Sequence, residues 1–263
     1  MIKINLKNNI AGGRLSLTNA YVKSVAEKLL ADFCPAALET PQPIDVDRLI
    51  TDYFGFDLLY ELLSHNLSVL GMTNFADGAL TLYDPSTKRT KKEKVKKNTV
   101  IIDSRMTEGT NKVRHSYTAA HECGHIIFDN LDVRQAREDS RQLMMECAEE
   151  FDPVAYHAAL PKNQKDDAKW IEHYCDHFAS CLILPDKTVK MAAAQILRKH
   201  KFASPFIYPH TEAEQKFAVD VLAGGVAAIF ETSKEAAMYK LFDLKIIRGG
   251  REFYERMKAK YGN

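Results

Sequence analysis

The sequence has few of the features that mark secreted, membrane-spanning or nucleic-acid-binding proteins. Its five cysteines are an odd number, are scattered and include no Cys-x-x-Cys pair, which argues against a disulfide framework. Its longest apolar stretch, residues 221–230, is too short to span a bilayer. A formal net charge of +1 gives the whole chain no strong attraction to nucleic acid or to acidic membranes.

These absences favour a cytoplasmic protein with a conventional core. The first residues alternate between apolar and polar side chains, as a strand does, and do not resemble a secretory signal. Unpaired cysteines are typical of a reducing compartment, where most of them serve as small buried side chains. A chain of 263 residues that is 46% hydrophobic suits one large domain, or a domain with a small appendage, without disulfides.

Hydrophobic periodicity predicts an α+β fold with its strands in the first half of the chain. The better strand candidates are residues 79–83 and 99–103, while residues 56–63 and 68–74 have strand or mixed character. The expected helices are residues 17–33, 45–53, 112–130, 167–184, 186–200, 212–230 and 233–242. Residues 232–235, Thr-Ser-Lys-Glu, fit a capping box ahead of the last helix.

Two polar segments interrupt this pattern. Residues 85–98 hold seven lysines or arginines and one glutamate. We interpret them as a solvated hairpin loop that guards an edge strand, with a contact for acidic protein or nucleic acid as the alternative. Residues 131–170 are charged and irregular and contain Pro153 and Pro161. We expect them to form an inserted helical segment that covers the active site as a lid.

The strongest chemical signal is His-Glu-Cys-Gly-His at residues 121–125, inside an expected helix. Residues four apart share one helix face, so the imidazoles of His121 and His125 can both reach one metal ion. Glu122 lies about 100° round the helix, so its carboxylate flanks the metal and can take a proton from a water molecule. The pattern predicts one zinc ion on the two histidines, with Glu122 as the catalytic base of peptide-bond hydrolysis.

A catalytic zinc needs a third protein ligand and one open position. Glu172 is the best candidate, because it lies on a strongly helical segment with Asp176 four residues later on the same face. Asp176 can then accept the second ring N–H of a ligand histidine and fix its tautomer. The alternative ligands on the same helix are His173, Cys175 and His177.

The residues around these two helices resemble the ImmA/IrrE group of metallopeptidases from bacteria and phages. Arg-His-Ser-Tyr-Thr-Ala-Ala at residues 114–120 leads into the histidine motif, with Tyr117 where Phe is usual. The second match, residues 172–185, contains Cys175 where Ala is common. Cys123 likewise replaces a common aliphatic residue, and packing is the expected role of both thiols, with a sensor of oxidation as the alternative.

The resemblance also extends, more weakly, to residues 43–50 and 232–244. It implies zinc ligands at His121, His125 and Glu172, the base Glu122, and a zincin-like fold whose sheet presents the substrate along an edge strand. We expect a zincin-like domain at residues 1–190 and a helical, helix-turn-helix-like module at residues 191–263. Because this module lacks a dense basic face, we interpret it as a packing unit and expect no direct nucleic-acid binding.

Members of this group are associated with cutting or inactivating helix-turn-helix repressors encoded beside them in mobile elements. The resemblance therefore implies control of transcription by proteolysis of one regulatory protein. The alternatives are a metal-stabilised antirepressor or toxin–antitoxin module that binds without cutting, and a zinc hydrolase for a non-protein amide. A further donor to the oxyanion is expected beside the metal. The candidates for this donor are His157, Tyr156, His173 and Tyr174.

Overall fold

The computed structural model describes residues 14–130 and 162–249, together with residues 4, 6, 9–11, 133, 255, 256 and 259. The chain forms two compact units. The first comprises Met1–Leu29 and Asp45–Ala179, and the second comprises Leu30–Ile44 and Ser180–Asn263. The domain boundary expected after residue 190 remains a prediction.

Two helices contribute residues to both units. They are α1 (Asn19–Phe33) and α7 (Lys162–Ile183). Both confirm the helices expected at their positions, although α7 begins five residues earlier than its periodicity suggested. The apolar residues that predicted α1, from Val22 to Leu30, are buried in the structure.

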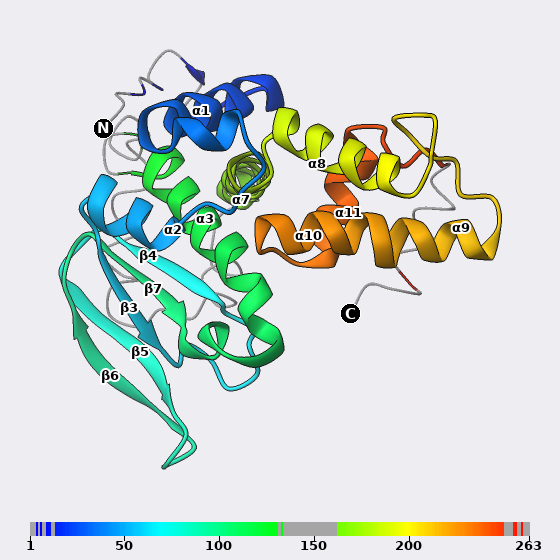
Figure 1. Cartoon of the computed structure of the whole chain (residues 1–263). Coiled ribbons are helices and arrows are strands. Elements are labelled where there is room, and N and C mark those ends of the chain that lie inside the picture. The colour runs from blue at the N-terminus through cyan, green and yellow to red at the C-terminus, as the bar shows by residue number, and fades with distance from the viewer. Residues whose placement is uncertain are drawn as a thin grey trace. The chain divides into compact units, whose positions relative to one another are not determined.

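The first unit is built around a three-stranded sheet in the order β3-β7-β4, drawn in Figure 1. The central strand β7 (Thr99–Asp103) is parallel to β3 (Asp57–Glu61) and antiparallel to β4 (Gly71–Asn74). Every residue of β7 is buried, which explains the apolar residues 100–102 at its centre. The three strands confirm the expectations for these places, with shorter limits for β3 and β4.

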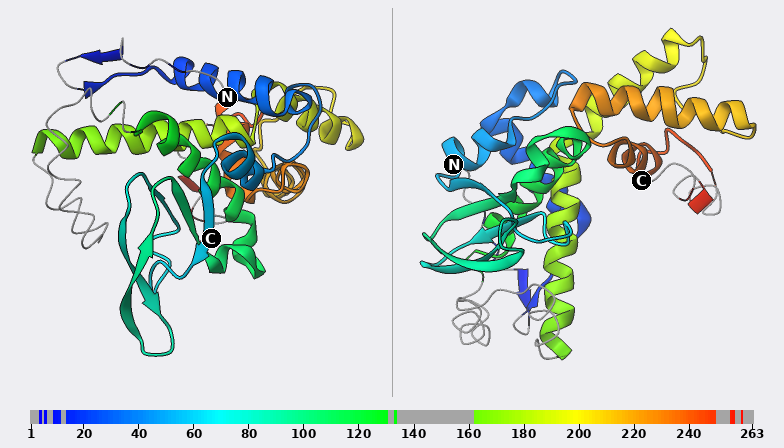
Figure 2. Two further views of the ribbon diagram at one scale, coloured as in Figure 1. Left: turned by 90° about the vertical axis from the view of Figure 1, so that its left-hand side faces the viewer. Right: turned by 90° about the horizontal axis from the view of Figure 1, so that it is seen from below.

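A two-stranded hairpin follows β4 in the chain and extends away from the sheet in Figures 1 and 2. It pairs β5 (Gly78–Asp84) with β6 (Arg89–Val95). The expectation of a loop throughout residues 85–98 is therefore wrong for β6. The sequence did not predict this strand because its first six residues are exposed and mostly polar. They therefore lack the alternation of apolar and polar residues by which a strand is recognised.

The helix that carries the histidine motif, α3 (Lys112–Phe128), packs against β4 and β7 and confirms the helix expected there. Its small residues Ala119 and Ala120 are buried, which lets the helix lie close to its neighbours. At its end the ring of Phe128 meets that of Phe178 on α7, with centroids 5.7 Å apart. Shorter helical segments, α2 (Val46–Arg48) and the π-helical Leu49–Tyr53, confirm the helix expected at 45–53.

A buried ion pair anchors the end of β7. The carboxylate of Asp103 is fully buried and accepts hydrogen bonds from Arg105 Nη2 at 2.7 Å and Nε at 2.8 Å, and from the amide of Leu63 at 3.2 Å. The same guanidinium donates to the carbonyl oxygens of Ser64 and His65. Arg105 thus ties the chain after β3 to the turn that leads from β7 towards α3.

The second unit is helical in its described residues after α7. It contains α8 (Asp186–Lys199), α9 (Glu212–Lys216), the π-helical Phe217–Ala223, α10 (Gly224–Phe230) and α11 (Lys234–Asp243). These elements confirm the three expected helices. An ion pair of 2.7 Å joins Lys240, which is only 5% exposed, to Asp186. Gly225 permits close packing, because a Cβ there would lie 2.8 Å from Ile196 Cδ1.

The helix caps differ from the sequence prediction. α11 is capped by Ser233, whose hydroxyl accepts from the amide of Ala236, so the box expected at Thr232 and Glu235 is wrong by one position. Thr232 Oγ1 is instead buried without a hydrogen-bond partner among the described residues. A full capping box occurs at Thr211 and Glu214, ahead of α9.

The predicted excursion at residues 131–170 can be compared with the structure only in part. Residues 162–170 belong to α7, while residues 131, 132 and 134–161 lie outside the described residues, and the proposed lid with them. Among the described helices, none combines the length and apolarity that crossing a membrane requires.

Candidate metal centre

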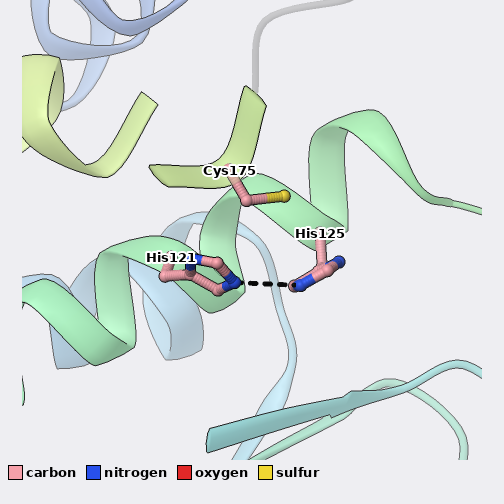
Figure 3. A group of neighbouring side chains, drawn as sticks. All are labelled: His121, His125 and Cys175. Atoms are coloured by element: carbon pink, nitrogen blue, oxygen red, sulfur yellow. Dashed lines mark hydrogen bonds between the residues drawn. The ribbon is translucent and has the colours of Figure 1, made fainter. Parts of the chain in front are cut away.

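The two histidines of the motif converge, as Figure 3 shows. His121 and His125 lie one turn apart on α3, and their Nε2 atoms are 3.2 Å apart. Two nitrogens bound to one tetrahedral zinc ion at 2.0–2.1 Å lie about 3.3 Å from each other. The observed separation therefore suits two ligands of a single metal ion.

The carboxylate of Glu172 reaches the same point from α7. Its Oε2 lies 3.2 Å from His121 Nε2, and its Oε1 lies 3.6 Å from His125 Nε2. Oxygen and nitrogen ligands of one tetrahedral zinc ion also lie about 3.4 Å apart. The three side chains together fit a single ion with two nitrogen ligands and one oxygen ligand.

Cys175 also lies beside the histidine pair. Its Sγ and one ring nitrogen of each histidine are all within 4.8 Å of one another. The thiol is fully buried, and burial raises its pKa well above the usual value. Glu172 nevertheless has the closer donor atoms, since its oxygens lie 3.2 and 3.6 Å from the histidine nitrogens.

Gly124 explains how α7 comes so near to α3. A Cβ at this position would lie 2.8 Å from Cys175 Cα and 3.1 Å from its Sγ. Such distances are too short for any side chain, so only glycine allows the two helices to meet here. The glycine of the histidine motif therefore has a packing role that fixes the distance between the histidines and Glu172.

Asp176 supports His121 from the side opposite Glu172. Its Oδ1 lies 2.9 Å from His121 Nδ1, so the other ring nitrogen, Nε2, is the one that faces His125 and Glu172. The hydroxyl of Tyr117 donates to the backbone oxygen of Asp176 at 3.1 Å. The sequence predicted the role of Asp176 but not that of this hydroxyl, because Tyr117 stands where the family usually has Phe, which has no hydroxyl.

Glu122 is 5% exposed and is held by β4. The hydroxyl of Thr73 donates to Glu122 Oε2 at 2.7 Å. A Cβ at Gly71 would lie 2.6 Å from Glu122 Oε1, so the strand can approach the carboxylate only because residue 71 is glycine. Sequence reasoning missed Thr73 and Gly71, since neither belongs to a motif and both lie about fifty residues from Glu122.

The charges around the histidines also suit a cation. Burial lowers the pKa of His121, but the hydrogen bonds with Asp176 and Glu172 outweigh it and raise that pKa to about 10. Burial likewise lowers the pKa of His125, and Asp129 and the charges of Glu122 and Glu172 raise it overall. A group of carboxylates that stabilises positive charge this strongly is the environment that a divalent ion requires.

The remaining candidates contact the N-terminal segment. His173 Nε2 lies 3.2 Å from Asn19 Oδ1, and His177 Nε2 lies 3.1 Å from the Asn19 carbonyl oxygen. The Tyr174 hydroxyl accepts from the amide of Leu17 at 3.0 Å and donates to the Leu15 carbonyl at 3.4 Å, so its proton is already engaged. The other two proposed oxyanion donors, Tyr156 and His157, lie outside the described residues.

Two histidines on one helix, a glutamate between them and a carboxylate on a second helix define a metallopeptidase-type domain. Comparison with protein families supports this class, because the family model of the IrrE N-terminal-like domain, Peptidase M78, matches residues 76–242. The chain therefore belongs to the Peptidase M78 family. The match includes both site helices, and the weaker similarity at residues 43–50 lies outside it. A comparison with curated proteins finds no match.

Proposed function

We propose that the protein is a zinc-dependent endopeptidase whose ligands are His121, His125 and Glu172. The observation that carries the proposal is the convergence of three donors, with separations of 3.2, 3.2 and 3.6 Å, beside a buried glutamate. Zinc is favoured because a site of two histidines and one carboxylate is common among catalytic zinc centres.

A bound zinc ion would polarise the scissile carbonyl and make a water molecule more acidic. Glu122 takes the proton of the attacking water on its carboxylate and delivers it to the leaving amine. The Thr73 hydroxyl, 2.7 Å from Glu122 Oε2, orients that carboxylate. Asp176 keeps the proton of His121 on Nδ1, so Nε2 offers its lone pair to the metal.

An extended polypeptide suits the position of β4. Among the described strands, β4 lies at one edge of the three-stranded sheet, and Thr73 connects it to Glu122. A substrate strand paired to this edge would pass beside the catalytic base, as the family resemblance implies. We infer that the substrate is one regulatory protein, a helix-turn-helix repressor encoded nearby, and that its cleavage controls transcription from a mobile element.

Four described cysteines are not in disulfides, which supports activity in a reducing cytoplasm. These are Cys34, Cys123, Cys175 and Cys181.

The test is cleavage of the repressor encoded beside the gene. The zinc-loaded protein and the repressor are incubated together, and a discrete pair of fragments is expected. Glu122→Gln keeps the three metal ligands, so it should bind zinc normally but cleave about 10²–10⁴-fold more slowly. Equal cleavage by wild type and Glu122→Gln would refute the assignment of the base. An uncut repressor that co-purifies with the protein would favour the antirepressor alternative.

A further inference from the structure

Cys175 has no role in the proposed peptidase site, yet its thiol lies against that site. The Sγ atom and one nitrogen each of His121 and His125 are all within 4.8 Å of one another. Figure 3 draws these three side chains together. Cys175 is three residues after Glu172 on α7, so both side chains emerge from one helix face. Its position is fixed, because its backbone fills the space that Gly124 leaves.

The distances allow the thiol to bind the same metal ion. Sulfur at 2.3 Å and nitrogen at 2.0–2.1 Å from a tetrahedral zinc ion lie about 3.6 Å apart. A displacement of about 1 Å would bring Sγ from its present limit of 4.8 Å to this separation. The thiol is fully buried beside the two histidines.

We propose that Cys175 is a fourth protein ligand, which competes with water for the last coordination position of the metal. This inference rests on the proposed metal site. Four protein ligands make a closed, structural type of zinc site, whereas a catalytic site keeps one position open. The protein thus has a closed form with Cys175 bound and an open form with three ligands. On closure the sulfur–metal bond forms, the thiol proton passes to solvent, and a water molecule leaves.

Cys123, which lies on the same helix as the two histidines, provides a matched control for the substitution of Cys175. It is as deeply buried as Cys175 and also has a raised thiol pKa caused by burial. It lies two residues from each histidine on α3, and two residues correspond to about 200° of rotation. Its side chain therefore starts from the opposite face of the helix.

The experiment replaces zinc with Co²⁺, whose bond to a thiolate gives a strong charge-transfer band in the near ultraviolet. The wild-type protein with one Co²⁺ per chain should show this band. Cys175→Ala should lose it while still binding one Co²⁺, and Cys123→Ala should keep it. Release of Co²⁺ to a chelator should be at least about tenfold faster from Cys175→Ala than from Cys123→Ala, since ligand-supporting contacts alone change affinity by this much.

The outcomes separate this inference from the proposed function. Wild-type protein that binds Co²⁺ without the band would overturn the role of Cys175 and leave the peptidase proposal intact. This result needs no variant, so it holds even if Cys175→Ala fails to fold. A band that persists in Cys175→Ala would also overturn the inference. Wild-type protein that binds neither Co²⁺ nor Zn²⁺ would refute both proposals.

Discussion

Each of the two compact units buries an ion pair, but the described residues of the first unit also include a group of metal-binding side chains. In the first unit, the carboxylates of Glu172 and Asp176 lie 3.2 and 2.9 Å from the ring nitrogens of His121, and neighbouring carboxylates raise the pKa of both His121 and His125. In the second unit, buried Lys240 forms an ion pair with Asp186. Within the described residues, no comparable group of metal-binding side chains occurs in the second unit. Among the described residues, the candidate metal ligands therefore lie in the first unit.

The largest expected effect is the loss of metal from the first unit. His125→Ala removes one of the two proposed nitrogen ligands, so the purified protein should contain almost no zinc, whereas the wild type should contain one ion per chain. His173→Ala is the control, because His173 lies on α7 but contacts Asn19. Metal analysis by mass spectrometry decides the matter. An equal zinc content per chain in wild type and His125→Ala would refute the proposed metal site of the first unit.

The next largest effect concerns the ion pair of the first unit. Arg105→Ala leaves the fully buried carboxylate of Asp103 without its cation. The free energy of unfolding should fall by about 3 kcal/mol, as expected when one partner of a buried pair is removed. Urea denaturation measures this loss. Arg105→Lys should recover part of it, since it restores the charge but not the forked geometry. A loss below about 1 kcal/mol would contradict the anchoring role.

A smaller effect is expected at Asp176. Asp176→Asn removes the carboxylate that holds His121 Nδ1 at 2.9 Å, and zinc affinity should fall about 10–100-fold. Tyr117→Phe serves as the control, because it removes only the hydroxyl that contacts Asp176 and should change affinity less. Competition with a chromogenic chelator gives both values. An unchanged affinity in Asp176→Asn would show that His121 needs no orientation.

The smallest effect belongs to the second unit. Lys240→Met removes the cation from Asp186, but that carboxylate is 22% exposed and can regain contact with water. The free energy of unfolding should therefore fall by only about 1 kcal/mol, less than for Arg105→Ala. Zinc content should stay the same. A loss of zinc in Lys240→Met would mean that the two units do not have separate roles.

Motifs local in sequence could be predicted, whereas contacts between distant segments could not. The spacing of His121 and His125 required only a helix, and the apolar run of β7 required only a buried strand. Thr73 reaches Glu122 across 49 positions, and nothing in a single sequence records that pairing. The strand β6 was not predicted although it is local in sequence. Its exposed lysines do not show the apolar alternation by which strands are recognised.

The closeness of Cys175 to the site could be inferred only in part. Its place on the same helix as Glu172 made it an alternative ligand, but the sequence did not tell how near α7 comes to α3. Gly124 decides that distance, because any Cβ there would collide with Cys175. The packing role of Gly124 can be recognised only from a structure that contains both α3 and α7.

The hairpin of β5 and β6 has a consequence for solubility. Its apolar residues Leu80, Leu82 and Val95 lie on one face of the paired strands, so Lys92 and Lys94, at alternate positions, lie on the other. An edge strand with this composition repels a second copy of itself, because like charges would meet when two such edges pair. The hairpin can therefore extend from the sheet at high protein concentration without starting strand-to-strand aggregation.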